Sequence, residues 1–278
     1  MPKQLTTSIN PNLYPGLSDL VHQMLTLGID GNIISGGMLG NDIPNVYGES
    51  VTQLATIGSK LRMNDSREFI YSKNGSAEIG HALMAQAEAA TSQWYDQLQT
   101  AYGWTAGEQA NTVLITAGST PAANEWAEGW MFVNVGTGLG YTYKILNNTS
   151  HATIPTVTIA EVDGVVADIP AASEVTILKS NFQDTILVAT GGLTAIAIGV
   201  PLITVTAEYY YWSQTKGPAA MIVDTDESLT IGLPVACPAT CAVAGAIGPA
   251  VTLEPHYGVC MRVGAAGQLA MINLDLGL

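Results

Sequence analysis

Charged side chains are scarce in this sequence, and basic ones are the scarcest. Only 12% of the 278 residues are Asp, Glu, Lys or Arg, and 23 acidic residues outnumber nine basic ones, which gives a formal net charge of −14 at pH 7. A chain this acidic repels the phosphates of DNA and RNA. The composition therefore argues against a nucleic-acid-binding protein, and we expect no nucleic-acid partner.

Cysteine is nearly absent. The three cysteines, Cys237, Cys241 and Cys260, are too few for a disulfide framework, and their surroundings of Ala and Val favour buried, reduced thiols. Together with His256 they are weak candidates for a zinc site, because their types and spacing only loosely match zinc ligands. We expect no metal and no cofactor. Reduced thiols also fit synthesis in the cytoplasm.

Targeting and membrane-spanning signals are lacking as well. The first residues, Met-Pro-Lys-Gln, lead into polar residues and not into the apolar core of a secretory signal. Residues 185–207 and 231–253 carry no charge and have the length of a membrane span. However, Gly and Pro interrupt both stretches, and no Lys/Arg cluster flanks them. We therefore expect strands and turns there, and no membrane partner.

Familiar catalytic signatures are missing too. The sequence has no Gly-x-Ser-x-Gly elbow and no Gly-Lys-Ser/Thr motif. Residues 135–140, Val-Gly-Thr-Gly-Leu-Gly, resemble a phosphate-binding loop, but a strand pattern follows where a helix is required. Residues 224–227, Asp-Thr-Asp-Glu, weakly resemble the acidic spacing of a calcium site. A solvated turn is the default for such a short acidic loop. The sequence predicts that the protein is not an enzyme.

One acidic pair keeps a different class of function open. Glu125 and Glu128 lie beside Trp126 and Trp130, an arrangement that could mimic a glycosidase carboxylate pair. Together with Trp212, these tryptophans define the alternative of a carbohydrate-binding or carbohydrate-active β protein. Acidic turns beside aromatic residues also arise often by chance.

What the sequence does contain favours β-structure. Beyond residue 110, β-branched and aromatic runs alternate with Gly, Pro or Asn breaks at the spacing of a sandwich or barrel. Further strands are expected over 51–57, 60–63 and 68–72. One helix is expected near residues 77–98, where helix-forming residues place their apolar side chains near one face. The expected fold class is mainly β, with a sandwich- or barrel-like body.

Composition shifts divide the chain into three parts. Residues 1–50, rich in Asn, Pro and Gly, predict an extended N-terminal arm that must lie on another surface. Residues 51–230 predict the main β-rich domain, including the helix. Residues 231–278 predict a C-terminal β unit of small residues, packed on the main domain.

The aromatic run at 209–212 is the most distinctive segment. In a strand, successive side chains face opposite sides, so both faces would carry large amphipathic rings. Such a strand is either buried on two sides or part of an interface. The basic cluster of residues 60–73 could likewise touch an acidic neighbour or form a solvated hairpin. The interface candidates are Tyr209, Tyr210, Tyr211, Trp212, Gln214, Arg62 and Arg67.

This segment resembles structural proteins of tailed bacteriophages. The resemblance is carried by Gly-Val-Pro at 199–201 leading into Tyr-Tyr-Trp-Ser-Gln-Thr-Lys-Gly-Pro at 210–218, and by short motifs at 57–61, 67–71 and 82–84. It is closest to capsid decoration (cement) proteins and covers motifs scattered over residues 50–265. The resemblance implies a β-tulip or barrel-like virion protein, commonly a homotrimer, that clamps capsomers on the outside of the capsid. Its implied partners are the major capsid protein and copies of itself.

The chain also departs from that family. Many cement proteins are much smaller, so the resemblance leaves a major capsid protein as the rival hypothesis. A shell-forming subunit would need a long spine helix and an extended loop. Residues 77–98, after the hairpin at 51–72, are the segment available for that role.

Overall fold

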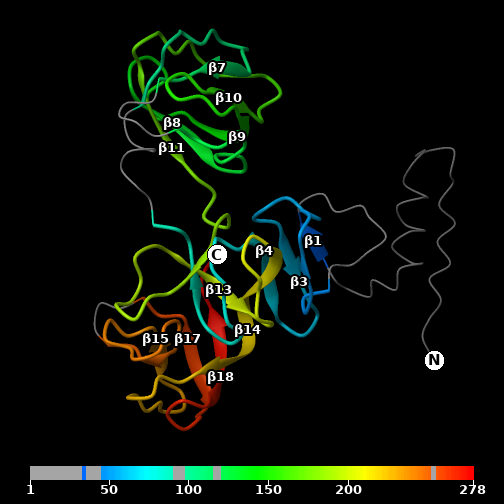
Figure 1. The fold of residues 1–278 in the computed structure, drawn as a ribbon, viewed down its shortest axis with the longest axis vertical. Coiled ribbons are helices and arrows are strands. Elements are labelled where there is room, and N and C mark those ends of the chain that lie inside the picture. The colour runs from blue at the N-terminus through cyan, green and yellow to red at the C-terminus, as the bar shows by residue number, and fades with distance from the viewer. Residues whose placement is uncertain (1–32, 36–44, 90–97, 115–119, 252–254) are drawn as a thin grey trace, which may run out of the picture.

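The computed structural model describes residues 33–35, 45–89, 98–114, 120–251 and 255–278. Within these residues every regular element is a β-strand, and the strands form one twelve-stranded and one six-stranded sheet. All pairs between named strands are antiparallel, and both sheets curl. The expected mainly β fold class is confirmed. The sheets belong to two bodies placed end to end along the longest axis (Figure 1).

The six-stranded sheet forms the small body, residues 98–178. An isolated bridge between Thr100 and Val113 brings its two end strands together. Alternate residues face inward, and Trp104, Trp126 and Tyr143 are among the side chains that fill the interior. The strands, in the order β6-β11-β8-β9-β10-β7, are β6 (Leu98–Gln99), β11 (Glu174–Leu178), β8 (Trp130–Val135), β9 (Thr142–Asn148), β10 (Thr156–Ile159) and β7 (Ala110–Thr112).

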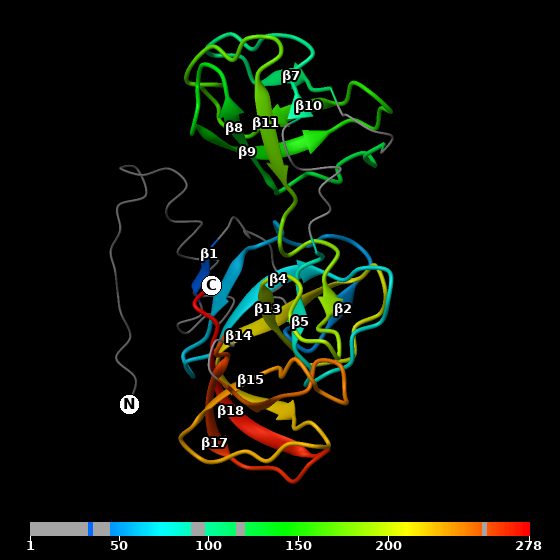
Figure 2. The ribbon, with the colours of Figure 1, turned by 90° about the vertical axis from the view of Figure 1, so that its left-hand side faces the viewer.

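The twelve-stranded sheet forms the large body. Its strands come from both sides of the small body in the sequence, so the small body is inserted between β5 and β12 (Figure 2). The strands are β1 (Ile33–Ser35), β2 (Glu49–Ser50), β3 (Lys60–Arg62), β4 (Glu68–Lys73), β5 (Ala85–Gln86), β12 (Ile186–Leu187), β13 (Ala197–Pro201), β14 (Tyr210–Ile222), β15 (Pro234–Ala236), β16 (Gly248–Pro249), β17 (Gly258–Arg262) and β18 (Leu269–Asp275).

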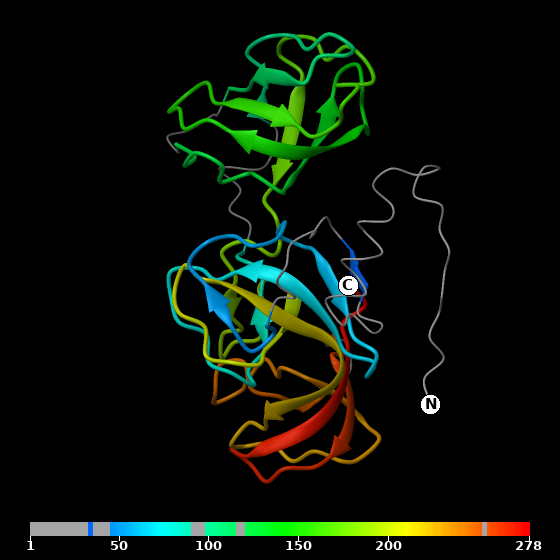
Figure 3. The same ribbon diagram turned by 90° about the vertical axis from the view of Figure 1, so that its right-hand side faces the viewer.

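The longest strand, β14, runs through both halves of the large body. Its first half pairs with β4, from Tyr210 opposite Lys73 onward, and its second half pairs with β18, from Lys216 opposite Asp275 to Ile222 opposite Leu269 (Figure 3). Beyond residue 110, the sequence predicts strands that are separated by Gly, Pro or Asn breaks. Instead, one strand of 13 residues continues through Gly217 and Pro218.

The second half of β14 belongs to a C-terminal barrel. Here the strand order is β14-β18-β17-β15-β16, and a bridge between Val223 and Ile247 leads back to β14. The interior is packed with buried apolar side chains, including Met221, Ile272 and Leu274. The boundary expected at residues 230 and 231 therefore falls within one continuous sheet.

The helix expected near residues 77–98 is wrong for the residues that the structure describes. Residues 77–89 are turns, bridges and the short strand β5, Leu98 begins β6, and 90–97 lie outside the described residues. Ala82 has a positive φ of 60°, which an α-helix does not tolerate. Backbone N–H groups of Ala82 and Met84 donate to Pro201 and Gly245, so long-range pairing replaces local helix bonds. The described residues contain no helix that is long and apolar enough to cross a membrane.

The extended N-terminal arm is not supported either. Residues 1–32 and 36–44 lie outside the described residues. Among the other residues of the expected arm, β1 pairs with β3, and β2 pairs with the start of β14. The expected strand over 51–57 does not form, whereas the strands expected over 60–63 and 68–72 are present as β3 and β4.

The close approach of Gly217 to a neighbouring turn yields a test of the β14 geometry. Gly217 has φ +83°, and a Cβ there would lie 2.7 Å from the Ser66 carbonyl oxygen. We expect Gly217→Ala to lower the free energy of unfolding by about 2–4 kcal/mol, because a steric clash adds to the cost of positive φ. Gly232→Ala is the matched control, since Gly232 has φ +81° with no atom near its missing Cβ. Equal losses in urea unfolding would contradict this packing.

Candidate functional site

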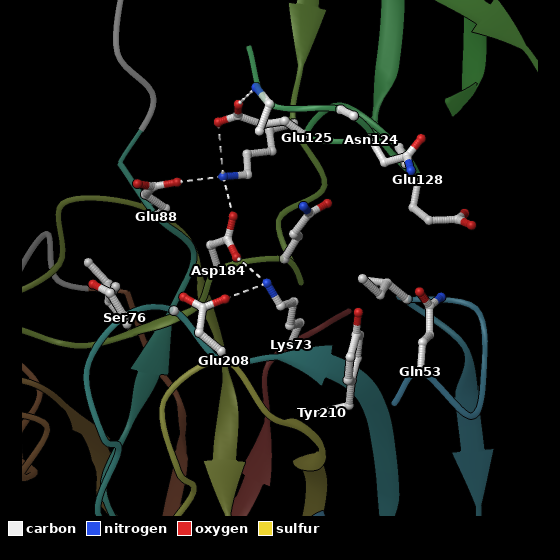
Figure 4. Close-up of a pocket in the computed structure, with 18 of the residues that line it drawn as sticks. Gln53, Lys73, Ser76, Glu88, Asn124, Glu125, Glu128, Asp184, Glu208 and Tyr210 are labelled. Carbon is white, nitrogen blue, oxygen red and sulfur yellow. Dashed lines mark hydrogen bonds and ion pairs between the residues drawn. The ribbon is translucent and has the colours of Figure 1, made fainter. Parts of the chain in front are cut away.

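A cavity of about 750 Å³ lies at the joint between the two bodies (Figure 4). Its volume falls in the range of small-molecule sites, but its walls are mainly polar and not apolar. The small body, the large body and the segment after β11 all contribute. The polar side chains around it are Gln53, Lys73, Ser76, Glu88, Asn124, Glu125, Glu128, Lys179, Gln183, Asp184, Glu208 and Tyr210.

Lys179 is the centre of the charge network in this joint. It follows β11 directly, and its side chain is 10% exposed. Its Nζ lies 2.9 Å from Glu88 Oε2 and 3.7 Å from Glu125 Oε1, and it also pairs with Asp184. Burial alone lowers the pKa of Lys179, but hydrogen bonds and charge from Asp184 and Glu88 outweigh burial and raise it. One ammonium therefore links carboxylates of both bodies.

Lys73, at the end of β4, extends this network. Its Nζ lies 2.6 Å from Glu208 Oε2 and 3.3 Å from Asp184 Oδ1. Burial lowers the pKa of Lys73, but the carboxylates of Glu208 and Asp184 more than compensate and raise it. Asp184 thus bridges two lysines, and Figure 4 shows it between Lys73 and Glu88.

The acidic pair singled out in the sequence lines the same cavity. Glu125 accepts a hydrogen bond from the Ala122 N–H at 2.7 Å. Burial raises the pKa of Glu125, and the charges of Asp184 and Glu88 raise it further against the opposing effect of Ala122 and Lys179. Glu128 instead pairs with Lys144 at 3.7 Å. The two carboxylates are thus held by different lysines.

The three tryptophans of the carbohydrate hypothesis do not share a surface. Trp126 is fully buried in the small body, and Trp212 is 2% exposed in a core of the large body. Trp130 is 43% exposed, and the ammonium of Lys144 lies 4.9 Å from the centre of its ring. Only Trp130 offers its ring to a partner.

Three of the interface candidates on β14 are buried. Tyr211 and Trp212 are 1% and 2% exposed, and Gln214 is fully buried. Gln214 donates through Nε2 to the carbonyls of Lys216 and Pro218. These side chains therefore occupy the interior of this chain.

The remaining interface candidates are spread over the large body. Tyr209 and Tyr210 are partly exposed, and Tyr210 lines the joint and stacks on Tyr71 with ring centres 5.9 Å apart. Arg62 is exposed, 3.4 Å from Glu68, whereas Arg67 is held at 2.7 Å by Asp65. The structure brings only Tyr210 to the joint.

The weak metal candidates do not assemble into a site. Cys237, Cys241 and Cys260 are buried in or beside the C-terminal barrel, whereas His256 is exposed. In the part of the chain that the structure describes, no group of three or more His, Cys, Asp or Glu residues is arranged to hold a metal ion. Burial raises the pKa of Cys241 and Cys260, which keeps both thiols protonated and unreactive.

The acidic loop at 224–227 has a structural use that the sequence did not reveal. Asp224 is 1% exposed. Its two carboxylate oxygens accept the N–H groups of Ala242 and Val243, each at 2.8 Å. A buried carboxylate that accepts backbone donors fixes a loop, here the one that follows Cys241.

The first test of the joint removes its central charge. Lys179→Met keeps the length of the side chain but leaves the carboxylates of Glu88, Glu125 and Asp184 without their shared cation. We expect the free energy of unfolding to fall by about 2 kcal/mol or more, and small-angle scattering to show looser coupling of the two bodies. Lys216→Met, at an exposed lysine outside the joint, should change neither measurement. Equal effects of both substitutions would contradict the role of Lys179.

The second test uses the raised pKa of Glu125. A carboxyl whose pKa is higher in the folded than in the unfolded protein favours folding at low pH, and this contribution is lost as the pH rises through the folded value. We therefore expect Glu125→Gln to be more stable than the wild type at pH 7. The difference should vanish below the ordinary value of 4.5, as followed by urea unfolding across pH. Glu78→Gln, at an exposed carboxylate outside the joint, is the control, and a less stable Glu125→Gln at pH 7 would overturn the prediction.

Comparison with protein-family models, with curated proteins and with solved structures finds no significant match. The joint and the outer surfaces of the two bodies therefore have to be interpreted from their own geometry and chemistry.

Proposed function

We propose that this protein is a structural virion protein, a decoration protein that binds and stabilises the head of a tailed bacteriophage. The proposal rests first on one observation: the small body carries exposed apolar side chains on neighbouring outward positions. Trp130 on β8 lies opposite both Leu178 on β11 and Lys144 on β9. Trp130, Leu178 and the nearby Leu146 are 43%, 40% and 53% exposed. We call these three residues the small-body patch.

The composition of this patch suits a protein partner. Binding energy at protein interfaces is concentrated in a few large side chains, above all aromatic ones, surrounded by weaker contacts. Trp130 is such a side chain, and the register places it between Leu178 and Lys144. The charge next to this ring, the ammonium of Lys144, is already paired with Glu128, which limits the cost of burying it under a partner. Because the protein has two bodies, the large body offers a second surface that can contact a neighbouring capsid subunit.

Two alternative functions can be distinguished from this proposal by experiment. A major capsid protein would assemble into shells when expressed alone, and residues 77–89 give no support to its spine helix because they form no helix. Of the three tryptophans in the carbohydrate hypothesis, only Trp130 is exposed and favours carbohydrate binding, since sugars stack on exposed aromatic side chains. It predicts binding to a glycan array that is lost with Trp130→Ala.

The deciding experiment is co-sedimentation of the full chain with undecorated heads of the phage that encodes it. We expect saturable binding at a fixed copy number per head, and greater resistance of decorated heads to heat. Trp130→Ala should weaken binding by about tenfold or more, because it removes the aromatic ring of the patch. Val162→Ala, at a side chain of the small body that is 86% exposed, should bind like the wild type. Absence of binding to heads would refute the proposal.

A further inference from the structure

The cavity at the joint and the small-body patch share a residue. Leu146, one of the three residues of the patch, is 53% exposed and also lines the cavity. Glu128 provides a second link, because it lines the cavity and pairs with Lys144, whose ammonium lies 4.9 Å from the centre of the Trp130 ring. A partner that packs on Trp130 and Leu146 is therefore brought to the edge of the cavity.

Several neutral polar side chains around the cavity have no partner within the described residues. Four of them line the cavity and form no side-chain hydrogen bond there: Ser76, Asn124, Gln183 and Tyr210. An amide offers an acceptor oxygen and two donor hydrogens, and a hydroxyl can both donate and accept. The carboxylates and lysines of the cavity, in contrast, are held in ion pairs. The side chains that are left for a ligand are therefore mainly neutral ones.

Unusual backbone conformations are concentrated around the same cavity. In the described ranges, seven non-glycine residues have a positive φ, and four of them line the cavity: Asn124 (φ 64°), Glu128 (61°), Asp184 (53°) and Glu208 (67°). Such a conformation is uncommon for a residue with a Cβ and persists where the surrounding structure enforces it, often at sites that bind a ligand. The backbone therefore supports a binding role for the cavity, and the chemistry of the walls has to identify the ligand.

The neutral polar walls suit an extended protein segment. The backbone N–H and C=O groups of such a segment need hydrogen-bond partners once water is removed, and unpaired amides and hydroxyls can supply them. Figure 4 shows Asn124 of the small body facing Gln53 and Tyr210 of the large body across the cavity. A small sugar could use the same groups, but it would not explain why the cavity adjoins the small-body patch. Five carboxylates against two lysines in the lining disfavour an acidic segment.

We propose that the joint cavity receives an extended, non-acidic segment of the capsid subunit that packs on the small-body patch. Trp130 supplies the apolar contact outside the cavity, and the side chains of Asn124, Gln183 and Tyr210 hydrogen-bond the backbone of the segment inside it. This inference rests on the proposed capsid binding and adds the place and the chemistry of a second contact. Because the segment touches both bodies, its binding also fixes their relative orientation.

The test compares two double variants of the full chain in co-sedimentation with undecorated heads. Gln183→Ala with Tyr210→Phe removes an amide and a hydroxyl from the cavity but keeps the ring that stacks on Tyr71. We expect the affinity for heads to fall about tenfold, because the loss of each hydrogen bond weakens binding by roughly threefold. The matched control, Gln268→Ala with Tyr102→Phe, makes the same changes at exposed positions outside the cavity and should bind like the wild type. Equal affinities of the two double variants would overturn the proposal.

Photo-crosslinking locates the segment directly. The cross-linking amino acid p-benzoylphenylalanine, introduced in place of Gln183, should react on irradiation with the capsid subunit of decorated heads. The same amino acid in place of Gln268 should not. Mass spectrometry of the cross-linked peptide should identify one capsid segment with no Asp or Glu at the point of attachment. Cross-links from position 183 that scatter over several segments, or that are absent on heads carrying the protein, would contradict a segment in the cavity.

The outcomes separate this inference from the proposed function. A wild type that does not bind heads refutes both. If Trp130→Ala weakens binding but Gln183→Ala with Tyr210→Phe does not, capsid binding stands and only the segment in the cavity is refuted. Thermal unfolding of the cavity variant should match that of the wild type, because neither polar group has a partner within the described residues. A loss of binding at unchanged stability therefore reports the missing contacts with the capsid.

Discussion

Strand β14 belongs to two cores at once, and the large body depends on its continuity. Its first half contributes Trp212 to one cluster, and its second half contributes Ala219 and Met221 to the C-terminal barrel. Between them, the register with β4 shifts at Gln214 and Lys216. The buried amide of Gln214 donates to two carbonyls of the strand at this shift, which compensates for ladder bonds lost there. Because one strand serves both cores, a displacement in one is transmitted to the other.

The β character was predictable, and the wrongly expected helix shows where local patterns fail. Residues 60–73 alternate and turn within a short segment, so β3 and β4 could be recognised from their own sequence. Residues 77–89 carry helix-forming side chains, yet Ala82 and Met84 donate backbone hydrogen bonds to residues more than a hundred positions away. Intrinsic helix propensity is worth only a few tenths of a kcal/mol per residue. Long-range pairing and burial outweigh it, and neither can be read from a local window.

Only some residues of the joint could be predicted from the sequence. Glu125 and Glu128 were singled out by their spacing, and both line the cavity. Lys179 and Asp184 belong to no recognisable motif. The small number of basic residues nevertheless drew attention to each lysine. In a chain with so few cations, a lysine next to an apolar strand has a high desolvation cost unless carboxylates surround it. Such partners come from distant segments, so the sequence could indicate that Lys179 is paired but not with which residues.

Because charged residues are scarce, the regions of the molecule differ clearly in whether their cations are paired. Where Lys73, Lys144 and Lys179 lie, carboxylates of the same chain neutralise them, and the two bodies are connected. Arg262 and Lys216 lie exposed on the C-terminal barrel, opposite Met271 and Asp275 respectively, and form no ion pair within the described residues. The cations of the C-terminal barrel are therefore open to solvent, whereas those of the joint are neutralised within the chain.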